Sequence, residues 1–231
     1  MQSSQFPSLF QAKSLEVINN LIEVSGSGFF LVQPDMQHSC AYLSNTPTEI
    51  EKAYTSFYFT LDPLNPSNFK DSDVRIVTLD SQIPQHELLA SRYYQEFMQP
   101  YRHRYVADIF LRNARQEIIA VISLLREKHL EDFSARDIEL LEAIHGFLEY
   151  TLNMVYLPKR ENERSALQQH YGLTDRELDV VELLISGASN KEIARRINMG
   201  IATLKTHLHH IYRKASVQSR TELTAQIMAE L

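Results

Sequence analysis

Residues 173–222 read LTDRELDVVELLISGASNKEIARRINMGIATLKTHLHHIYRKASVQSRTE. Within this stretch a Ser or Thr is followed three residues later by Glu at three places, beginning at Thr174, Ser189 and Ser219. In this spacing the hydroxyl accepts a hydrogen bond from the third helical N–H, and the carboxylate reaches back to the N–H of the capping residue. Each pair therefore predicts the start of a helix.

The apolar residues that follow the caps recur at helical spacing. The first helix is expected to end at Gly187, because glycine adopts the positive φ that follows many helix C-termini. A further helix is expected from about Ile201 to Ala215. Four short helices with tight turns are typical of a compact helix-turn-helix unit. The apolar residues expected to face inward are Leu178, Val181, Leu184, Ile185, Ile193, Ala194, Ile197, Leu204, Leu208, Ile211, Leu223, Ile227 and Leu231.

Charge is distributed unevenly along the chain. The formal net charge of the 231 residues is −6, which taken as a whole argues against nucleic-acid binding. Residues 190–220 nevertheless carry seven Lys or Arg side chains and a single acidic one, Glu192. Salt screens charges beyond a Debye length of about 10 Å, so this local basic region can still attract phosphate.

The rest of the composition is that of an ordinary globular protein. The hydrophobic fraction is 44%, and no apolar run approaches the roughly 20 residues that span a bilayer. Residues 1–10 contain no basic residue ahead of an apolar stretch, so no secretory signal is expected there. With one cysteine, Cys40, an internal disulfide is excluded. We therefore expect a cytoplasmic protein without membrane contact.

Five short motifs lie in the C-terminal 60 residues. They are Leu173-Thr174-x-Arg176-Glu177, Gly187-x-Ser189-Asn190-Lys191-Glu192-Ile193-Ala194, Thr203-Leu204-Lys205-Thr206-His207, Ile211-x-x-Lys214 and Ser219-Arg220-x-Glu222. Together they resemble the LuxR/FixJ/NarL-type helix-turn-helix domain. Two positions depart from that pattern, because Gly200 stands where a capping Ser is usual and Ala215 where a Leu is usual.

The resemblance implies a sequence-specific transcriptional regulator that binds double-stranded DNA through its third C-terminal helix. By resemblance, Lys205, Thr206 and His209 take the base-reading positions on that helix. Lys can donate to guanine O6 and N7, and the Thr methyl group can contact a thymine methyl group. Phosphate contacts fix register without reading sequence. The residues expected to make them are Lys191, Thr203, Arg213, Lys214 and Arg220.

The first 157 residues predict mixed elements around an antiparallel sheet, an α+β fold. Residues 25–28 are interpreted as a break between two elements. The expected elements are helices over 8–24, 47–60, 84–97 and 134–157, strands over 29–32 and 74–79, and a hairpin of 106–111 with 118–125. The features Tyr93-Tyr94-Gln95-Glu96-Phe97, Pro100, the hairpin, Arg126, Phe133 and the helix from Asp137 resemble the end of GAF/PAS-like sensor domains.

These patterns predict three segments. Residues 1–157 form a GAF/PAS-like sensor and dimerisation domain, and residues 170–231 form the all-α DNA-binding domain. The polar segment 158–169 is interpreted as a linker, with Pro158 ending the long helix. The signal that the sensor domain receives, a small molecule or a protein partner, stays open.

Two other sensor types are alternatives to the GAF/PAS-like one. A phosphoacceptor receiver needs an acidic pair after its first strand and a parallel sheet, whereas the segment after 29–32 offers only Asp35. An acyl-homoserine-lactone domain is suggested by Asp62-Pro63 after a Tyr-rich helix. That family relies on Trp in its pocket, and this chain has none, so such a receptor would need an altered pocket. Several aromatic residues could line a pocket or fill the core, and at any one position the core is the better interpretation, so no ligand residues are assigned. They are Phe29, Phe30, Phe57, Tyr58, Phe59, Tyr93, Tyr94, Phe97 and Phe110.

The predicted helix 134–157 has a stripe of mainly apolar residues that could form a dimer contact. Its members are Ile138, Leu141, His145, Leu148, Leu152 and Val155, spaced alternately by three and four. Such a stripe packs either into its own domain or against a second copy of the helix. We expect a homodimer, formed through helix 134–157, through the fourth C-terminal helix 219–230, or through both.

Other functions find little support in the sequence. We find no Gly-rich phosphate loop, nucleophile elbow or metalloprotease motif, so an enzyme is not expected. His207 and His210 share a helical face, and Cys40 lies close to His38, but neither pair has the ligand set of a metal site. No cofactor or metal is expected. A protein-only interaction module without DNA binding is the remaining alternative.

Overall fold

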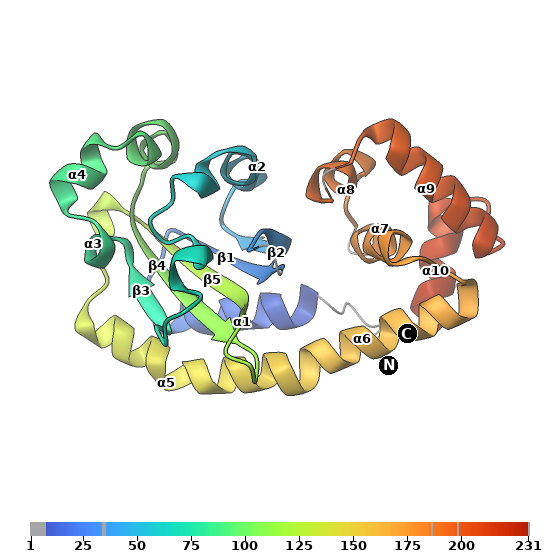
Figure 1. The fold of residues 1–231 in the computed structure, drawn as a ribbon, viewed down its shortest axis with the longest axis horizontal. Helices are drawn as coiled ribbons and strands as arrows, with labels where there is room; N and C mark the ends of the chain where they lie inside the picture. Colours follow the sequence, from blue (N-terminus) through green and yellow to red (C-terminus); the bar gives the residue numbers. More distant parts are fainter. Residues whose placement is uncertain (1–7, 34–35, 186, 198, 231) are drawn as a thin grey trace. The chain divides into compact units, whose positions relative to one another are not determined.

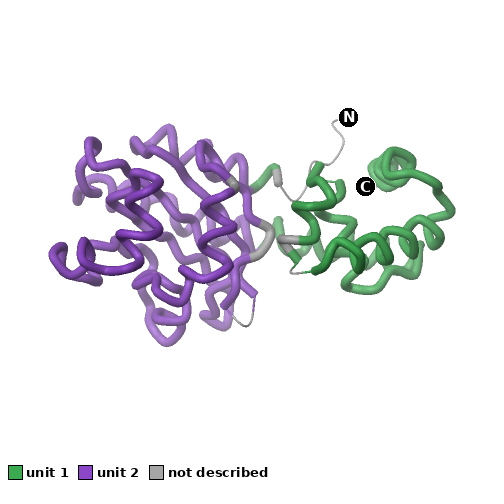
Figure 2. The backbone as a smooth tube through the Cα atoms, turned by 90° about the horizontal axis from the view of Figure 1, so that it is seen from above, with its two compact units in different colours: residues 1–10, 154–231 green, residues 11–153 purple. Residues whose placement is uncertain are grey.

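The computed structural model describes residues 8–33, 36–185, 187–197 and 199–230. The chain divides into two compact units, residues 11–153 and residues 1–10 with 154–231, which are coloured separately in Figure 2. Within the described segments, no helix is both long and apolar enough to cross a membrane.

A five-stranded antiparallel sheet organises the first unit. In chain order its strands are β1 (Gly26–Val32), β2 (His38–Ser44), β3 (Ile76–Thr78), β4 (His103–Arg112) and β5 (Ile118–Glu127). Their order across the sheet is β2-β1-β5-β4-β3. The predicted α+β class is confirmed, and the antiparallel pairing excludes the parallel sheet of a receiver.

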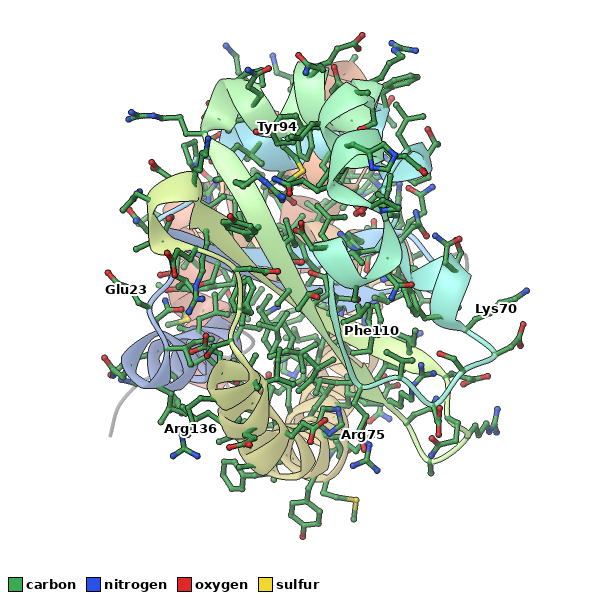
Figure 3. All side chains as sticks on the ribbon, turned by 90° about the vertical axis from the view of Figure 1, so that its left-hand side faces the viewer. Glu23, Lys70, Arg75, Tyr94, Phe110 and Arg136 are labelled. Atoms are coloured by element: carbon green, nitrogen blue, oxygen red, sulfur yellow. The ribbon has the colours of Figure 1, made fainter. Side chains whose placement is uncertain are left out.

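Helices cover both faces of this sheet. Helices α1 (Ser8–Leu21) and α5 (Ala135–Thr151) lie on one face, as Figure 1 shows. The other face carries α2 (Thr48–Ser56), α3 (Leu79–Gln82), α4 (Gln85–Ala90) and the π-helical turn Tyr93–Met98. Because neither face meets water, all seven residues of β1 are buried. Phe110 lies inside the unit, whereas Lys70 and Arg136 lie at its periphery (Figure 3).

Residues 25–28 were expected to separate a helix from a strand, but most of them belong to the strand itself. Strand β1 already begins at Gly26, and β2 was not expected at all. A Cβ on Gly26 would lie 2.5 Å from Thr46 Oγ1, and one on Gly28 would lie 2.7 Å from the ring of Phe30. The glycines therefore permit close approach of neighbouring groups inside the sheet. In the sequence alone, such glycines cannot be distinguished from those of a turn.

The helix predicted over 84–97 is interrupted. Helix α4 ends at Ala90, and the backbone of the next residue, Ser91, is extended. The Ser91 hydroxyl accepts a hydrogen bond from the Tyr94 N–H at 3.1 Å. The chain then resumes as the π-helical turn Tyr93–Met98. Ser91 thus acts as a local cap in the middle of an apparently continuous helical pattern.

The prediction that Pro158 ends the helical structure is wrong. Residues Leu152–Tyr156 form a π-helical segment, and α6 (Leu157–Tyr171) follows with Pro158 in its first turn. In a first turn the missing proline N–H costs no intrahelical hydrogen bond. Residues 158–169, expected as a linker, are therefore helical.

Most of the stripe on α5 packs into the core of its own domain, whereas Val155 at its end is 51% exposed. Leu141, His145, Leu148 and Leu152 are buried, and His145 Nε2 lies 2.8 Å from the Phe110 carbonyl oxygen. The sheet thus already covers the face that the sequence also allowed as a dimer seam. Helix α5 starts as expected, with a reciprocal capping box between Ser134 and Asp137.

Candidate nucleic-acid interface and buried pocket

Four short helices follow α6. They are α7 (Asp175–Ile185), α8 (Asn190–Arg196), α9 (Ile201–Lys214) and α10 (Arg220–Glu230). One apolar core joins them, and it also includes Leu167 and Tyr171 of α6. Leu178, Leu204 and Leu223, each from a different helix, contribute side chains to it. This is the four-helix unit that the motifs predict.

The caps set where these helices begin. Thr174 and Glu177 form a reciprocal capping box, as do Ser189 and Glu192. At the third site the Ser219 hydroxyl accepts from the Glu222 N–H, while the Glu222 carboxylate accepts from the Gln218 N–H instead. The prediction of three capped helix starts is confirmed, and Gly187 has the expected positive φ of 88°.

Helix α9 separates its apolar and polar faces. Leu204, Leu208 and Ile211 are buried in the core. Lys205, Thr206 and His209 are exposed on the remaining surface. The Thr206 hydroxyl donates to the Ala202 carbonyl oxygen at 3.2 Å, so that hydroxyl is engaged within its own helix. The helix thus presents an ammonium group, a threonine and an imidazole together on one exposed side.

The five residues expected to contact phosphate fall into two groups. Lys191, Thr203 and Arg213 have exposed side chains. Lys214 and Arg220 instead make contacts within the domain. Lys214 Nζ lies 2.6 Å from Glu177 Oε2 and donates to the Gly172 carbonyl oxygen.

Arg220 stabilises the end of α7. Its guanidinium donates to the carbonyl oxygens of Leu184 and Ala188 at 2.8 and 2.9 Å. The last carbonyls of a helix have no intrahelical partner, and the Leu184 carbonyl in the last turn of α7 accepts from the Gly187 N–H as well as from Arg220. Arg220 therefore connects the start of α10 to the end of α7.

The structure shows where Gly200, which departs from the family pattern, and the histidines of α9 lie. Gly200 is the N-cap of α9, and no side-chain hydrogen bond closes that end. His207 and His210 are partly buried, and in the part of the chain that the structure describes no three His, Cys, Asp or Glu side chains form a metal-sized cluster. The Cys40 side chain lies outside the described residues.

The first unit contains a buried pocket between the sheet and α2. A cavity of about 70 Å³ is lined by residues from β1, β2, α2, β4 and β5, with the turn before Leu64 and the π-helical turn. One water needs about 10–15 Å³ on the same measure, so the cavity has room for several waters or a small organic molecule. Its aromatic walls include Phe30, Tyr54, Tyr93 and Phe97.

Three carboxyl groups line this cavity, and two of them, Asp62 and Asp108, are buried. Asp62 accepts hydrogen bonds from the Tyr54 hydroxyl at 2.7 Å and from the Leu64 N–H at 2.8 Å. Burial raises the pKa of Asp62 to about 6 despite those bonds. Burial, together with the charge of Asp62, also raises the pKa of Asp108 well above its usual value. Asp108 Oδ1 is buried and has no hydrogen-bond partner.

His38 forms part of the same wall. Its ring stacks on Phe30 and on Tyr54, with centroid separations of 4.7 and 5.2 Å. Both ring nitrogens are buried without a hydrogen-bond partner, and burial lowers the pKa of His38 to about 4. At neutral pH this histidine is therefore uncharged and does not neutralise the carboxyl groups.

The sequence drew attention to Asp62 without assigning it to a pocket, and it gave Asp108 no role, although one signal for Asp108 was available. Asp108 interrupts the apolar strand that runs from Val106 to Leu111. A carboxylate inside such a strand is seldom buried without a reason. The structural role of Glu177, which is buried although it belongs to a capping box, had no comparable signal.

The family described as "Bacterial regulatory proteins, luxR family" matches residues 172–227. The monoamine regulon transcriptional regulator of Klebsiella aerogenes is 30% identical over 215 residues, covering 93% of this chain and 88% of that protein. The chain belongs to the luxR family of bacterial regulatory proteins. This LuxR-type DNA-binding transcriptional regulator has an N-terminal sensor domain and is not an enzyme.

Other relatives match parts of this LuxR-family regulator. The nitrate/nitrite response regulator protein NarP of Escherichia coli is 41% identical over 69 residues, which cover 30% of this chain and 32% of NarP. The VqsR LBD domain from Pseudomonas aeruginosa has a TM-score of 0.47 at 14% identity and covers 62% of this chain and 83% of that one. Escherichia coli SdiA has a TM-score of 0.41 at 17% identity and covers 93% of this chain and 87% of that one.

Proposed function

We propose that α9 enters the major groove of double-stranded DNA and that Lys205, Thr206 and His209 read base edges there. The observation that carries the proposal is the division of α9 into a fully buried apolar face and an exposed face that holds these three side chains. A major groove about 12 Å wide admits one helix. In a bacterium this regulator then acts in the cytoplasm, where the chromosome lies.

Lys191, Thr203 and Arg213 hold the phosphates in this proposal. Their side chains are exposed, on α8 and α9. Lys214 and Arg220 were also expected to contact phosphate, but their hydrogen bonds within the domain favour a role in holding α7, α9 and α10 together. Phosphate contacts fix register and contribute to affinity on every sequence alike.

Lys191→Ala tests the phosphate role. The variant should bind specific and scrambled DNA more weakly by a similar factor, and its plot of log K against log salt should flatten by about 0.9, the slope of one phosphate contact. Salt titration of both DNAs measures this. Lys70→Ala, an exposed lysine of the first unit, is the matched control and should leave the slope unchanged. A Lys191→Ala variant with an altered sequence preference and an unchanged slope would contradict the role.

We also propose the division of labour along the chain. Residues 1–157 sense and dimerise, residues 170–231 bind DNA, and residues 158–169 connect them as a helical linker. Contacts of α6 with α7 support a linker that transmits position, because Arg160 pairs with Glu182 at 2.7 Å and Arg164 with Asp179 at 3.1 Å. A small molecule held in the pocket beside Asp62 and Asp108 is the proposed signal.

A homodimer on two half-sites about one helical turn apart completes the proposal. Its support is an apolar surface on α5, opposite the face that packs on the sheet. Phe147 and Tyr150 are 70% and 63% exposed, and residues three apart share a helical face. Large aromatic side chains left in solvent favour burial against a partner.

Phe147→Glu tests that surface. The substitution should shift the dimer to monomer in sedimentation velocity and weaken specific DNA binding at least about tenfold, because linked half-sites gain affinity from effective concentration. Arg136→Glu places the same charge on an exposed position of α5, where Arg136 is 73% exposed, and should leave the dimer intact. A Phe147→Glu variant that remains a dimer places the interface elsewhere, α10 being the other candidate.

A further inference from the structure

The pocket of the first unit has an uncompensated acidic character. Asp62 and Asp108 are 8% and 5% exposed, and both line the cavity. Among the cavity's described lining residues there is no Lys or Arg. His38 and His103 also line it, and burial lowers the pKa of both, so neither supplies a positive charge at neutral pH. Two neighbouring buried carboxyl groups without a cation are costly in any protein.

The unpartnered atoms point to a missing donor. Asp108 Oδ1 is buried and accepts no hydrogen bond, and the two His38 ring nitrogens are in the same condition. Buried acceptors of this kind normally have a partner from the protein, a water or a ligand. A ligand that brings several N–H donors and a positive charge would satisfy the carboxyl groups and the histidine acceptor nitrogen together.

The remaining walls are suited to the body of such a ligand. Phe30 and Tyr54 stack on His38, and Tyr58 stacks on Phe97 with a centroid separation of 5.0 Å. Aromatic faces attract a cation within about 6 Å of the ring centroid and pack well against apolar or aromatic groups. The cavity thus combines an acidic end with an aromatic enclosure.

We propose that this pocket binds a small organic ammonium ion, with its charged nitrogen at Asp62 and Asp108 and its apolar or aromatic body against His38, Tyr54 and Phe97. The inference rests on the proposed small-molecule signal of the sensor domain and names its chemical class. An acyl-homoserine lactone, which is neutral, offers one amide N–H and no charge to this acidic pair.

Ammonium binding should depend on pH. Burial raises the pKa of Asp62 to about 6 and that of Asp108 well above its usual value, so the empty pocket takes up protons as the pH falls toward 6. Glu51, Tyr54, Tyr93, His38 and His103 are the other titratable groups that face the cavity. A bound cation displaces the carboxyl protons, so binding releases protons and strengthens as pH rises from about 5.5 to 7.5.

The test is calorimetric titration of the full-length protein with a small panel of probes. The panel contains butylammonium, 2-phenylethylammonium, the neutral 2-phenylethanol, phenylacetate and an N-acyl-homoserine lactone, all at one ionic strength. At least one ammonium probe should bind more than tenfold tighter than the alcohol, and phenylacetate should not bind. Titration in buffers of different ionisation enthalpy should reveal proton release.

Asp108→Asn keeps the shape of the side chain and removes its charge. It should weaken ammonium binding at least tenfold and leave 2-phenylethanol binding within about threefold. Asp71→Asn is the matched control, since Asp71 has an 88% exposed carboxylate outside the cavity. Thermal unfolding of each variant establishes that it is folded, and the comparison of probes on the unmodified protein does not depend on any variant.

The outcomes distinguish failure of the proposed ligand class from failure of the proposed small-molecule sensor. Tighter binding of the alcohol or the lactone than of every ammonium probe overturns the ligand class and leaves a small-molecule sensor standing. Failure of all ammonium probes, or ammonium binding that Asp108→Asn does not weaken, also overturns the class. Stabilisation by Na⁺ or Mg²⁺ equal to that by the ammonium probes assigns the acidic pair to an inorganic ion. None of these results changes the DNA-reading proposal, which Lys191→Ala tests separately.

Discussion

The double variant Lys205→Ala/His209→Ala should lose specific DNA binding and fall to the affinity of the protein for scrambled DNA. Both side chains are exposed on α9, beside a buried face that fixes the helix in the domain. Each base contact contributes about 1–3 kcal/mol of discrimination. Two contacts in each half-site of a dimer therefore remove a specificity of about 10³-fold or more, which is the typical excess of specific over non-specific binding.

Competition between a selected site and scrambled DNA at fixed salt measures this loss. Lys70→Ala/His86→Ala removes the same residue types from exposed positions of the first unit and should retain the specificity ratio. Thermal unfolding should be unchanged in both double variants because neither pair lies in a core. Retained preference for the selected site in Lys205→Ala/His209→Ala would refute the assignment of α9 as the reading helix.

Lys214→Met should destabilise the C-terminal helices rather than act on DNA alone. Glu177 is 3% exposed and pairs with Lys214 Nζ at 2.6 Å. Removing one partner of a fully buried pair costs about 3–5 kcal/mol, and because the Lys214 side chain is 28% exposed we expect a smaller loss, about 2–3 kcal/mol. Hydrogen exchange of the amides of α7 and α9 reads this loss within the full-length protein.

The pH dependence gives a second check on this pair. Burial alone would raise the pKa of Glu177, but hydrogen bonds from Lys214 and Thr174 outweigh it and hold that pKa below its usual value. A depressed carboxyl pKa adds stability above the unfolded pKa and loses it as pH falls through the folded pKa. The difference in the free energy of unfolding between the original protein and Lys214→Met should therefore be largest near neutral pH. It should shrink below about pH 4.3, the ordinary pKa of Glu.

Lys205→Met on the same helix is the control for Lys214→Met. Lys205 is exposed, so its substitution should leave hydrogen exchange unchanged and reduce DNA affinity. The opposite result for Lys214→Met, unchanged exchange with a salt slope flattened by about 0.9, would return that lysine to the phosphate contacts.

The C-terminal half was predictable because its signals are local. Capping boxes such as Thr174 with Glu177 place helix starts within a few residues, and inward leucines such as Leu204 follow from a 3.6-residue period. Once the inward-facing positions of α9 are assigned, the remaining positions are expected to be exposed. The inward contacts of Lys214 and Arg220 could not be derived in this way, because they join residues more than 30 positions apart.

The N-terminal half depends on contacts distant in sequence, and there the predictions were weaker. A Gly-Ser-rich stretch is typical of a turn, yet Gly26 and Gly28 lie in strand β1. Glycine is required at these two positions of the strand because Thr46 and Phe30 occupy the space of a Cβ. The pocket draws Asp62 and Asp108 together from segments 46 residues apart. The pairing of β4 with β5 positions Asp108, and the hydrogen bond from Tyr54 on α2 holds Asp62 at the same cavity.

The central claim is that α9 reads the major groove, and dimethyl sulfate footprinting tests it most directly on a site selected by the full-length protein. The reagent methylates guanine N7 in the major groove and adenine N3 in the minor groove, and the two edges are chemically distinct. If α9 reads the major groove, guanine N7 is protected in two clusters about 10 base pairs apart while adenine N3 stays unprotected at those positions. The Lys205→Ala/His209→Ala variant should lose this protection. Protection confined to adenine N3, or guanine protection that the double variant retains in full, would contradict that claim.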